Sequence, residues 1–154
     1  MKIVSGGQTG ADRAALDAAI SIGLEHGGWL PKGRKTEDGP LPSTYKLQEL
    51  QSGHYRVRTE QNVIDSDGTL ICSFGPLTGG SALTEALAIK HDRPCLHIDF
   101  TLYAEDKAVN VTQQWLTTNA IRTLNVAGPR LSGQPKIYAA VLGLLQKIAW
   151  NALP

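Results

Sequence analysis

Three glycine-rich turns carry the residues of this sequence that are best suited to binding chemistry. The first turn is "GGQTGAD" (residues 6–12), the second is "GPLTGGS" (75–81) and the third is "GPRLSGQP" (128–135). Each turn follows an apolar run that predicts a strand, and the first two also precede a predicted helix. A helix N-terminus offers unpaired backbone N–H groups and a partial positive charge, and glycine lets a ligand come close. The turns therefore predict a site for a phosphate or another oxyanion.

The candidate binding residues lie in these turns, just after the second one, and in a long loop over residues 31–44. The full candidate set is Gly6, Gly7, Gln8, Thr9, Gly10, Lys32, Arg34, Gly79, Gly80, Ser81, Thr84 and Arg130. The hydroxyl and amide side chains supply polar groups, and the basic side chains could supply charge-assisted hydrogen bonds. Other interpretations stay open: glycine turns also serve packing, and basic loop residues also suit a solvated surface. Asp12 also suits simple stabilisation of the first helical turn by its charge.

Several familiar motifs are absent or misplaced. The first turn lacks the Gly-Lys-Ser/Thr end of a Walker A loop, and the dinucleotide pattern G-x-G-x-x-G is not present. The segment "DSDGTL" (65–70) resembles the signature of haloacid-dehalogenase-type phosphatases, whose first Asp is a nucleophile at the carboxyl end of a strand. Here the apolar run follows the Asp pair, so both carboxylates are expected at the amino end. Cys72 and Cys95 have no second ligand at metal spacing, so no metal site is expected.

Alternating strands and helices must position the three turns. Strands are expected over residues 2–5, 26–31, 54–57, 68–74, 94–100 and 122–128, and helices over 11–23, 43–50, 59–65, 81–91, 105–119 and 135–153. This alternation predicts an α/β, three-layer Rossmann-like fold with a mostly parallel sheet and helices on both faces. Ligands of such sheets bind beyond the carboxyl ends of the strands, so the three turns should rim one edge.

Composition argues against two classes of partner. The formal net charge of +1 does not favour binding to nucleic acid or to a membrane surface. No signal peptide is visible, and the longest apolar run, residues 137–145, is too short to span a bilayer. We expect a cytoplasmic protein with a single Rossmann-like domain over residues 1–154.

With the turns in place, the sequence resembles the molybdenum carrier family. The resemblance rests on "GGQTGADRAALDAA", "GWLPKGR", "EDGPLPSTY", "RTEQNVIDSDGTLI", "LTGGSALTEA" and "LNVAGPR", which occur in order over nearly the whole chain. That family belongs to a Rossmann-like superfamily with the cytokinin-activating, lysine-decarboxylase-like phosphoribohydrolases and a DNA-processing protein. The resemblance implies a nucleotide or a phosphate-bearing pterin such as molybdenum cofactor as the ligand, and a homo-oligomer, either a dimer or a tetramer.

One departure from that superfamily bears on activity. The phosphoribohydrolases carry P-G-G-x-G-T-x-x-E, and matching their Gly-Thr pair to Gly80–Ser81 puts Thr84 at the Glu position. Glu85 is one residue later, and one residue on a helix is a rotation of about 100°. We therefore expect a binding or carrier protein rather than a hydrolase. Two alternatives stay open: an N-glycosidic enzyme that uses Asp12 or Glu85, and a nucleotide-sensing module.

Overall fold

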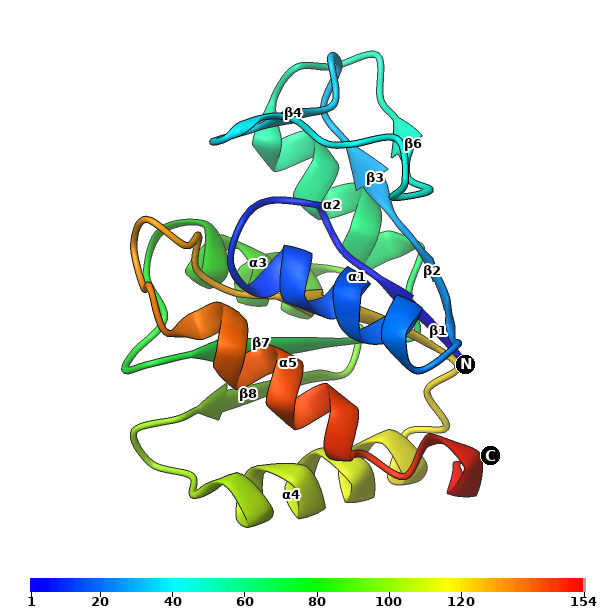
Figure 1. The fold of residues 1–154 in the computed structure, drawn as a ribbon, viewed down its shortest axis with the longest axis vertical. Helices are drawn as coiled ribbons and strands as arrows, with labels where there is room; N and C mark the ends of the chain where they lie inside the picture. The colour runs from blue at the N-terminus through cyan, green and yellow to red at the C-terminus, as the bar shows by residue number, and fades with distance from the viewer. Residues whose placement is uncertain (154) are drawn as a thin grey trace.

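The computed structural model describes residues 1–153 and contains a five-stranded parallel sheet (Figure 1). Its strands are β1 (Lys2–Val4), β2 (Glu25–Gly27), β7 (Gly68–Ser73), β8 (Cys95–Asp99) and β9 (Thr123–Ala127), in the order β2-β1-β9-β7-β8. All four pairings of neighbouring strands are parallel. The last strand of the sequence therefore lies at the centre of the sheet, between β1 and β7.

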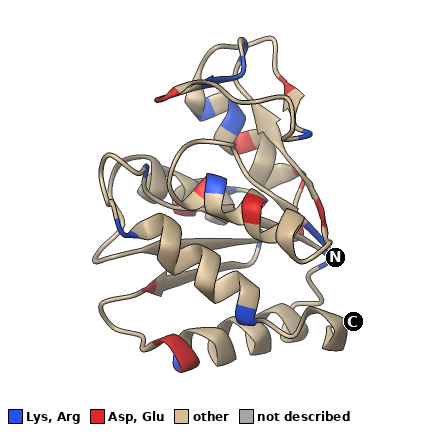
Figure 2. Cartoon of the chain, in the orientation of Figure 1, with Lys and Arg blue, Asp and Glu red and all other residues tan. Residues whose placement is uncertain are grey.

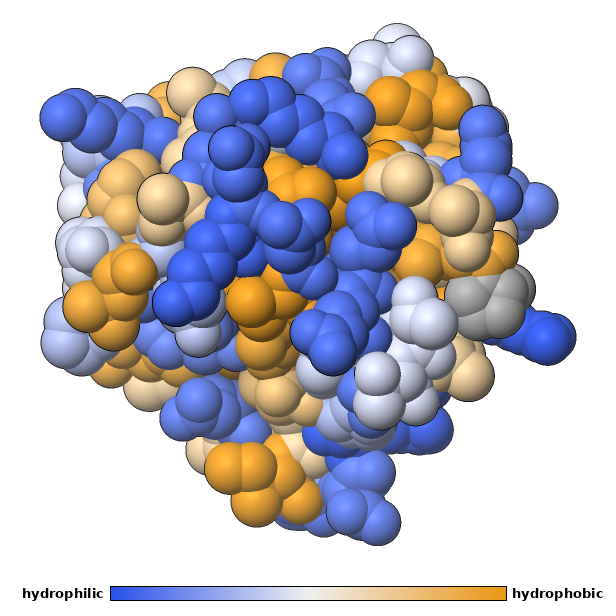
Figure 3. Space-filling view, turned by 90° about the horizontal axis from the view of Figure 1, so that it is seen from below, coloured by the Kyte–Doolittle hydropathy of each residue, from blue (hydrophilic) through white to orange (hydrophobic). Residues whose placement is uncertain are grey.

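Helices cover both faces of this sheet, which confirms the three-layer α/β prediction. The helices are α1 (Ala11–Ser21), α2 (Tyr55–Ile64), α3 (Gly79–Lys90), α4 (Glu105–Thr118) and α5 (Ile137–Lys147), followed by the short 3-10 helix η1 (Trp150–Ala152). Helices α1, α4 and α5 form the main core with one face of the sheet, while α2 and α3 pack together on the other (Figure 1). The outer surface on the α4 side mixes hydrophobic areas with hydrophilic residues that interrupt them (Figure 3).

The composition of two elements explains the close packing around the first turn. Strand β7 is buried along its whole length, as its apolar sequence predicts for a central parallel strand. Helix α1 presents the buried alanines Ala11, Ala14, Ala15, Ala18 and Ala19, and it contacts β1, β9 and α5. Because alanine side chains are small, α1 can lie close to the sheet, and its N-terminus is held against the carboxyl ends of the strands.

Residues 29–50 form a separate layer of short strands above α1 and beside α2 (Figure 1). Strands β4 (Lys35–Thr36) and β5 (Gly39–Pro40) form a hairpin, and β3 (Trp29–Leu30) pairs in parallel with β6 (Gln48–Glu49). The helix expected over residues 43–50 is therefore wrong. Arg34 explains the difference, because its guanidinium donates to the backbone carbonyls of Tyr45 and Leu47, which a helix would need for its own hydrogen bonds, and also to those of Leu41 and Pro42.

Two smaller expectations also differ from the structure. Residues 54–57 do not form a strand, because Tyr55 begins α2, which buries Val63 against α3. The last helix ends at Lys147, and Ile148 has extended backbone before η1. Within residues 1–153, no helix combines the length and the apolar character needed to cross a bilayer.

Candidate functional site

A cleft of about 360 Å³ opens at the carboxyl end of the sheet, and all three glycine turns line it. The first turn contributes Gly6, Gln8 and Asp12, the second contributes Pro76 to Ser81, and the third contributes Gly128 to Gln134 apart from Leu131. Helix α2 adds Tyr55, Arg56, Arg58, Thr59 and Asn62, and β9 adds Asn125. The expectation that the three turns meet at one edge of the sheet is confirmed, although the three turns differ in how their backbone amides are used.

The first turn closes around a carboxylate of its own. The Gln8 amide donates to Asp12 Oδ2 at 3.3 Å, and Arg58 Nη1 lies 3.3 Å from the same oxygen. Arg58 Nη1 also donates to the carbonyl of Gly6 at 2.8 Å, and it fills the space where a Cβ on Gly6 would lie. Asp12 therefore occupies the position at the helix N-terminus where a bound anion would otherwise lie.

Burial of the Asp12 side chain favours the protonated form of its carboxyl group. Burial raises the pKa of Asp12 to about 6, and the charges of Arg58 and Arg13 and the amides of Gln8 and Gly6 only partly oppose this shift. The Arg58 guanidinium is itself buried, and burial lowers its pKa while Asp12 opposes the lowering. The two residues thus form a buried ion pair that holds α2 to the first turn.

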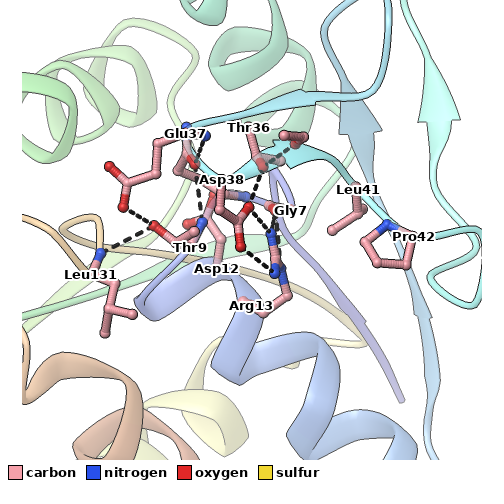
Figure 4. Close-up of polar contacts among 12 residues, drawn as sticks. Gly7, Thr9, Asp12, Arg13, Thr36, Glu37, Asp38, Leu41, Pro42 and Leu131 are labelled. Carbon is pink, nitrogen blue, oxygen red and sulfur yellow. Dashed lines mark hydrogen bonds and ion pairs between the residues drawn. The ribbon is translucent and has the colours of Figure 1, made fainter.

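Gln8 and Thr9 connect the first turn to the β4–β5 hairpin. Gln8 Oε1 accepts hydrogen bonds from the amides of Thr9 at 3.1 Å and Glu37 at 2.8 Å. The Thr9 hydroxyl donates to Glu37 and accepts from the amide of Leu131 at 3.2 Å (Figure 4). Thr9 does not line the cleft, whereas Gln8 lines it and its buried Nε2 has no hydrogen-bond partner within residues 1–153.

The hairpin tip fastens the first turn to the third. Glu37 accepts hydrogen bonds from the Ser132 amide at 3.2 Å and the Ser132 hydroxyl at 2.6 Å, and these with Thr9 lower its pKa. Asp38 pairs with Arg13 at 3.2 Å (Figure 4). The amides of Gly133 and Gln134 donate to the Arg130 carbonyl, so most amides of the third turn are also taken by the protein itself.

The second turn is open by contrast. The amides of Gly79 and Gly80, at the N-terminus of α3, donate no hydrogen bond within residues 1–153. A Cβ built on either glycine would meet nothing within 4 Å. The Thr84 hydroxyl donates to the Gly80 carbonyl at 2.8 Å, and Ser81 lines the cleft beside it. These are the free backbone donors that a helix N-terminus can offer to an anion.

Basic side chains gather around one aromatic ring on the opposite wall. The charged groups of Lys35, Arg58 and Arg130 lie 5.1, 5.3 and 4.9 Å from the centre of the Tyr55 ring. Arg56 and Arg130 line the cleft, and within residues 1–153 neither side chain makes a hydrogen bond or an ion pair. Figure 2 shows Lys and Arg residues on the first half of α2 and on the neighbouring hairpin, and Arg130 belongs to the third turn.

The cleft contains seven of the twelve expected residues, Gly6, Gln8, Gly79, Gly80, Ser81, Thr84 and Arg130, and it does not contain Gly7, Thr9, Gly10, Lys32 and Arg34. Lys32 and Arg34 also lie outside the three turns, so no contact with the cleft supports their expected role in ligand binding. The Arg34 guanidinium donates hydrogen bonds to the carbonyls of Leu41, Pro42, Tyr45 and Leu47, and it thereby stabilises the conformation of the loop.

The sequence interpretation missed the contribution of α2. Tyr55, Arg58, Thr59 and Asn62 follow a helical spacing, which puts them on one face of α2 toward the cleft. A helix that begins at Tyr55 reveals this face, whereas the strand expected over residues 54–57 does not.

Glu85, in α3, and Asp67, just before β7, do not line the cleft. The charge of Glu85 acts on Cys95, whose pKa is raised to about 11 by burial first and Glu85 second. Asp67 accepts the amides of Arg122 and Thr123, at the amino end of β7. The phosphatase-like arrangement of this Asp pair is therefore absent. No group of three or more His, Cys, Asp or Glu residues within residues 1–153 could hold a metal ion.

Comparison with known proteins agrees with this architecture. The model of the circularly permutated YpsA SLOG family matches residues 3–149. A crystal structure of the "Putative molybdenum carrier protein" from Syntrophus aciditrophicus SB is similar, with a TM-score of 0.95 and 52% sequence identity over 96% of this chain and 94% of that one. The comparison with curated proteins gave no match. The chain therefore belongs to the circularly permutated YpsA SLOG family, and its resemblance to the molybdenum carrier family is confirmed.

Proposed function

We propose that the cleft binds an anionic, phosphate-bearing small molecule and that the protein acts as its carrier. The observation that carries this proposal is the pair of unused amides at Gly79 and Gly80, which face the same cleft as the unpaired Arg130 and Arg56. A helix N-terminus and guanidinium groups are the two donors that proteins use most readily for phosphate. The cleft volume of about 360 Å³ suits a ligand of the size of a nucleotide or a phosphorylated pterin.

The name of the similar protein supports molybdenum cofactor as the nominal ligand. Molybdenum cofactor is a pterin that bears a phosphate, so this cleft could hold it by its phosphate without a protein ligand to the metal. A nucleotide offers the same phosphate and is the principal alternative cargo. Within the proposal, Gly79, Gly80 and Ser81 hold a phosphate group and Arg130 adds positive charge to the cleft, while Gly6, Gly7, Thr9 and Gly10 shape the first turn.

The side chains of the cleft favour binding over hydrolysis. At the position of the superfamily's Glu stands Thr84, whose hydroxyl is already used by the Gly80 carbonyl. The acid that lines the cleft is Asp12, and it is engaged by Arg58 and the Gln8 amide. The pKa of about 6 at Asp12 does suit a general acid, and this observation keeps an N-glycosidic enzyme as the second candidate function.

Calorimetry with nucleoside monophosphates tests the proposal. We expect the full chain to bind AMP or GMP, and Gly80→Asp to weaken that binding at least tenfold, because a carboxylate would occupy the open anion position. Gly53→Asp is the matched control, because Gly53 also has open space around it but does not line the cleft. Equal affinities for Gly80→Asp and Gly53→Asp would count against this site.

The same samples separate a carrier from an enzyme. We expect no free base after prolonged incubation with either nucleotide, measured by chromatography. Release of base that disappears in Asp12→Asn would establish the N-glycosidic activity instead. Native mass spectrometry of freshly purified protein would report the mass of any bound cargo and the proposed homo-oligomer in one measurement.

A further inference from the structure

We propose that the ligand carries two linked anionic groups, as in a diphosphate ester, and that Arg130 and Arg56 bind the second one. This inference rests on the proposed function, in which the first anionic group lies at the N-terminus of α3. It adds a ligand class, because diphosphates should bind in preference to monophosphates. It also assigns this preference to residues of α2 and of the third turn.

The first argument is the crowding of like charges around Tyr55. Three cationic groups lie between 4.9 and 5.3 Å from the centre of its ring, and a ring has only two faces. At least two cations must therefore share a face or an edge. Arg130 is close enough to Arg58 to contribute to the lowering of the Arg58 pKa, after the larger effect of burial. Such crowding is unfavourable unless an anion joins it.

The second argument is the shortage of carboxylates on this wall. Asp12 pairs with Arg58, while the oxygens of Glu37, whose pKa the charge of Arg130 helps to lower, already accept three hydrogen bonds from Thr9 and Ser132. Within residues 1–153, Lys35 and Arg56 have no ion-pair partner. The protein therefore gathers more positive charge here than it neutralises.

The third argument is the set of buried donors without partners. Gln8 Nε2 and Arg58 Nε are both buried, both belong to side chains that line the cleft, and neither has a hydrogen-bond partner in residues 1–153. Unpaired buried donors are costly, so they indicate an acceptor that arrives with the ligand. Gln8 belongs to the first turn and Arg58 to α2, whereas Gly79 and Gly80 belong to α3. Because the two sets of donors come from different elements of the cleft, a ligand with two anionic groups suits them better than a single phosphate.

Calorimetry of the full chain with inorganic phosphate and pyrophosphate, without metal ions, tests the inference. We expect pyrophosphate to bind at least tenfold more tightly than phosphate, and ADP at least tenfold more tightly than AMP. Arg130→Gln should reduce this preference to less than threefold while phosphate affinity changes less than twofold. Arg122→Gln is the matched control, since it removes the same charge at the amino end of β9, and it should keep the full preference.

The outcomes distinguish the two proposals. Equal binding of phosphate and pyrophosphate by the natural chain would overturn the second anion site and leave the proposed function intact. A preference that survives in Arg130→Gln, or falls equally in Arg122→Gln, would also overturn it, because general attraction of charge would then explain the result. Failure of all four ligands to bind would overturn both proposals. Circular dichroism checks folding, and Arg56→Gln repeats the test if Arg130→Gln does not fold.

Discussion

The first and second glycine turns occupy the same kind of position, between a parallel strand and a helix, but their backbone amides have different partners. Each leads from a parallel strand into a helix and carries glycines at the helix N-terminus. In the first turn the amides of Gln8, Thr9 and Ala11 donate to Asp12, to Gln8 Oε1 and to the Pro129 carbonyl, whereas in the second the amides of Gly79 and Gly80 are unused. The same local sequence pattern therefore serves packing in one place and offers donors in the other, and only the partners of the amides separate the two roles.

The surroundings of the glycines show the same contrast. A Cβ on Gly10 would lie 2.4 Å from the Pro129 carbonyl oxygen and 2.7 Å from the Leu131 amide nitrogen. Gly10 also has φ 78° and ψ −126°, which side chains other than hydrogen rarely allow. Gly80 has open space around it. The fold therefore needs glycine at position 10, whereas at position 80 a small side chain would meet only what enters the cleft.

The largest expected effect comes from Gly10→Ala. The new Cβ would meet backbone atoms of the third turn, and the strained backbone adds a further cost, so we expect the free energy of unfolding to fall by at least about 3 kcal/mol. Urea denaturation at pH 7 measures this loss. A loss below about 1 kcal/mol would show that the first turn can relax and would remove the contrast with the second.

A second test uses the pH dependence of the buried carboxylate in the first turn. Because burial raises the pKa of Asp12 from 3.8 to about 6, the folded state holds this proton more tightly than the unfolded state. The contribution of Asp12 to stability is therefore complete below pH 3.8 and is lost as the pH rises through 6. Two pKa units correspond to about 3 kcal/mol.

Comparison with Asp12→Asn isolates this group from the other carboxylates. We expect the stability of the natural chain minus that of Asp12→Asn, from urea denaturation at each pH, to decrease between pH 4 and pH 7. Loss of the partner of Arg58 adds an offset that does not depend on pH, because Arg58 keeps its charge over this range. A difference that is flat, or that rises with pH, would contradict the closed state of the first turn.

A smaller effect is expected for the hydrogen bonds by which Glu37 joins the first turn to the third. In Glu37→Gln the acceptor of the Ser132 amide loses its charge, and an exposed hydrogen bond of this kind contributes about 1 kcal/mol. Hydrogen exchange of the Ser132 amide should therefore become about fivefold faster. The Phe74 amide, which donates to Gln134 Oε1, is an internal control and should keep its rate. Unchanged exchange at Ser132 would show that Glu37 does not hold the third turn.

The smallest effect is expected at the second turn. Gly80→Ala adds a methyl group into open space near the start of α3, where alanine has the higher helix propensity. We expect the free energy of unfolding to stay within about 1 kcal/mol of the natural value, in the direction of a gain. A larger loss in the same urea experiment would mean that the second turn, like the first, depends on its glycine for the fold.

Much of the fold could be predicted from the sequence because its signals are local. The apolar run of β7 and the glycine turns after β1, β7 and β9 are typical of a parallel sheet, and the parallel direction alone brings the turns together. The helix expected over residues 43–50 failed because Arg34, distant in sequence, binds the carbonyls of that segment. Local propensity contains no information about such a partner.

The candidate site was harder to predict for the same reason. Arg34 and Arg58 are alike as residue types, yet Arg34 brackets a loop while Arg58 is buried against the first turn. The sequence predicts a ligand-binding role for Arg34 because it lies in a long loop. It gives no such role to Arg58, which lies on a helix that the sequence predicts in part as a strand. Which turn keeps free amides also depended on Asp12 and Glu37, whose hydrogen bonds reach across the fold.

The central position of β9 decides when this protein can take shape during synthesis. Strand β9 is the one that joins β1 to β7, so the first 122 residues contain two unconnected strand pairs, β2 with β1 and β7 with β8. A nascent chain must therefore make residues 123–127 before hydrogen bonds can join the two strand pairs into one sheet. The third turn follows β9 directly, so the cleft is completed only after these residues are in place.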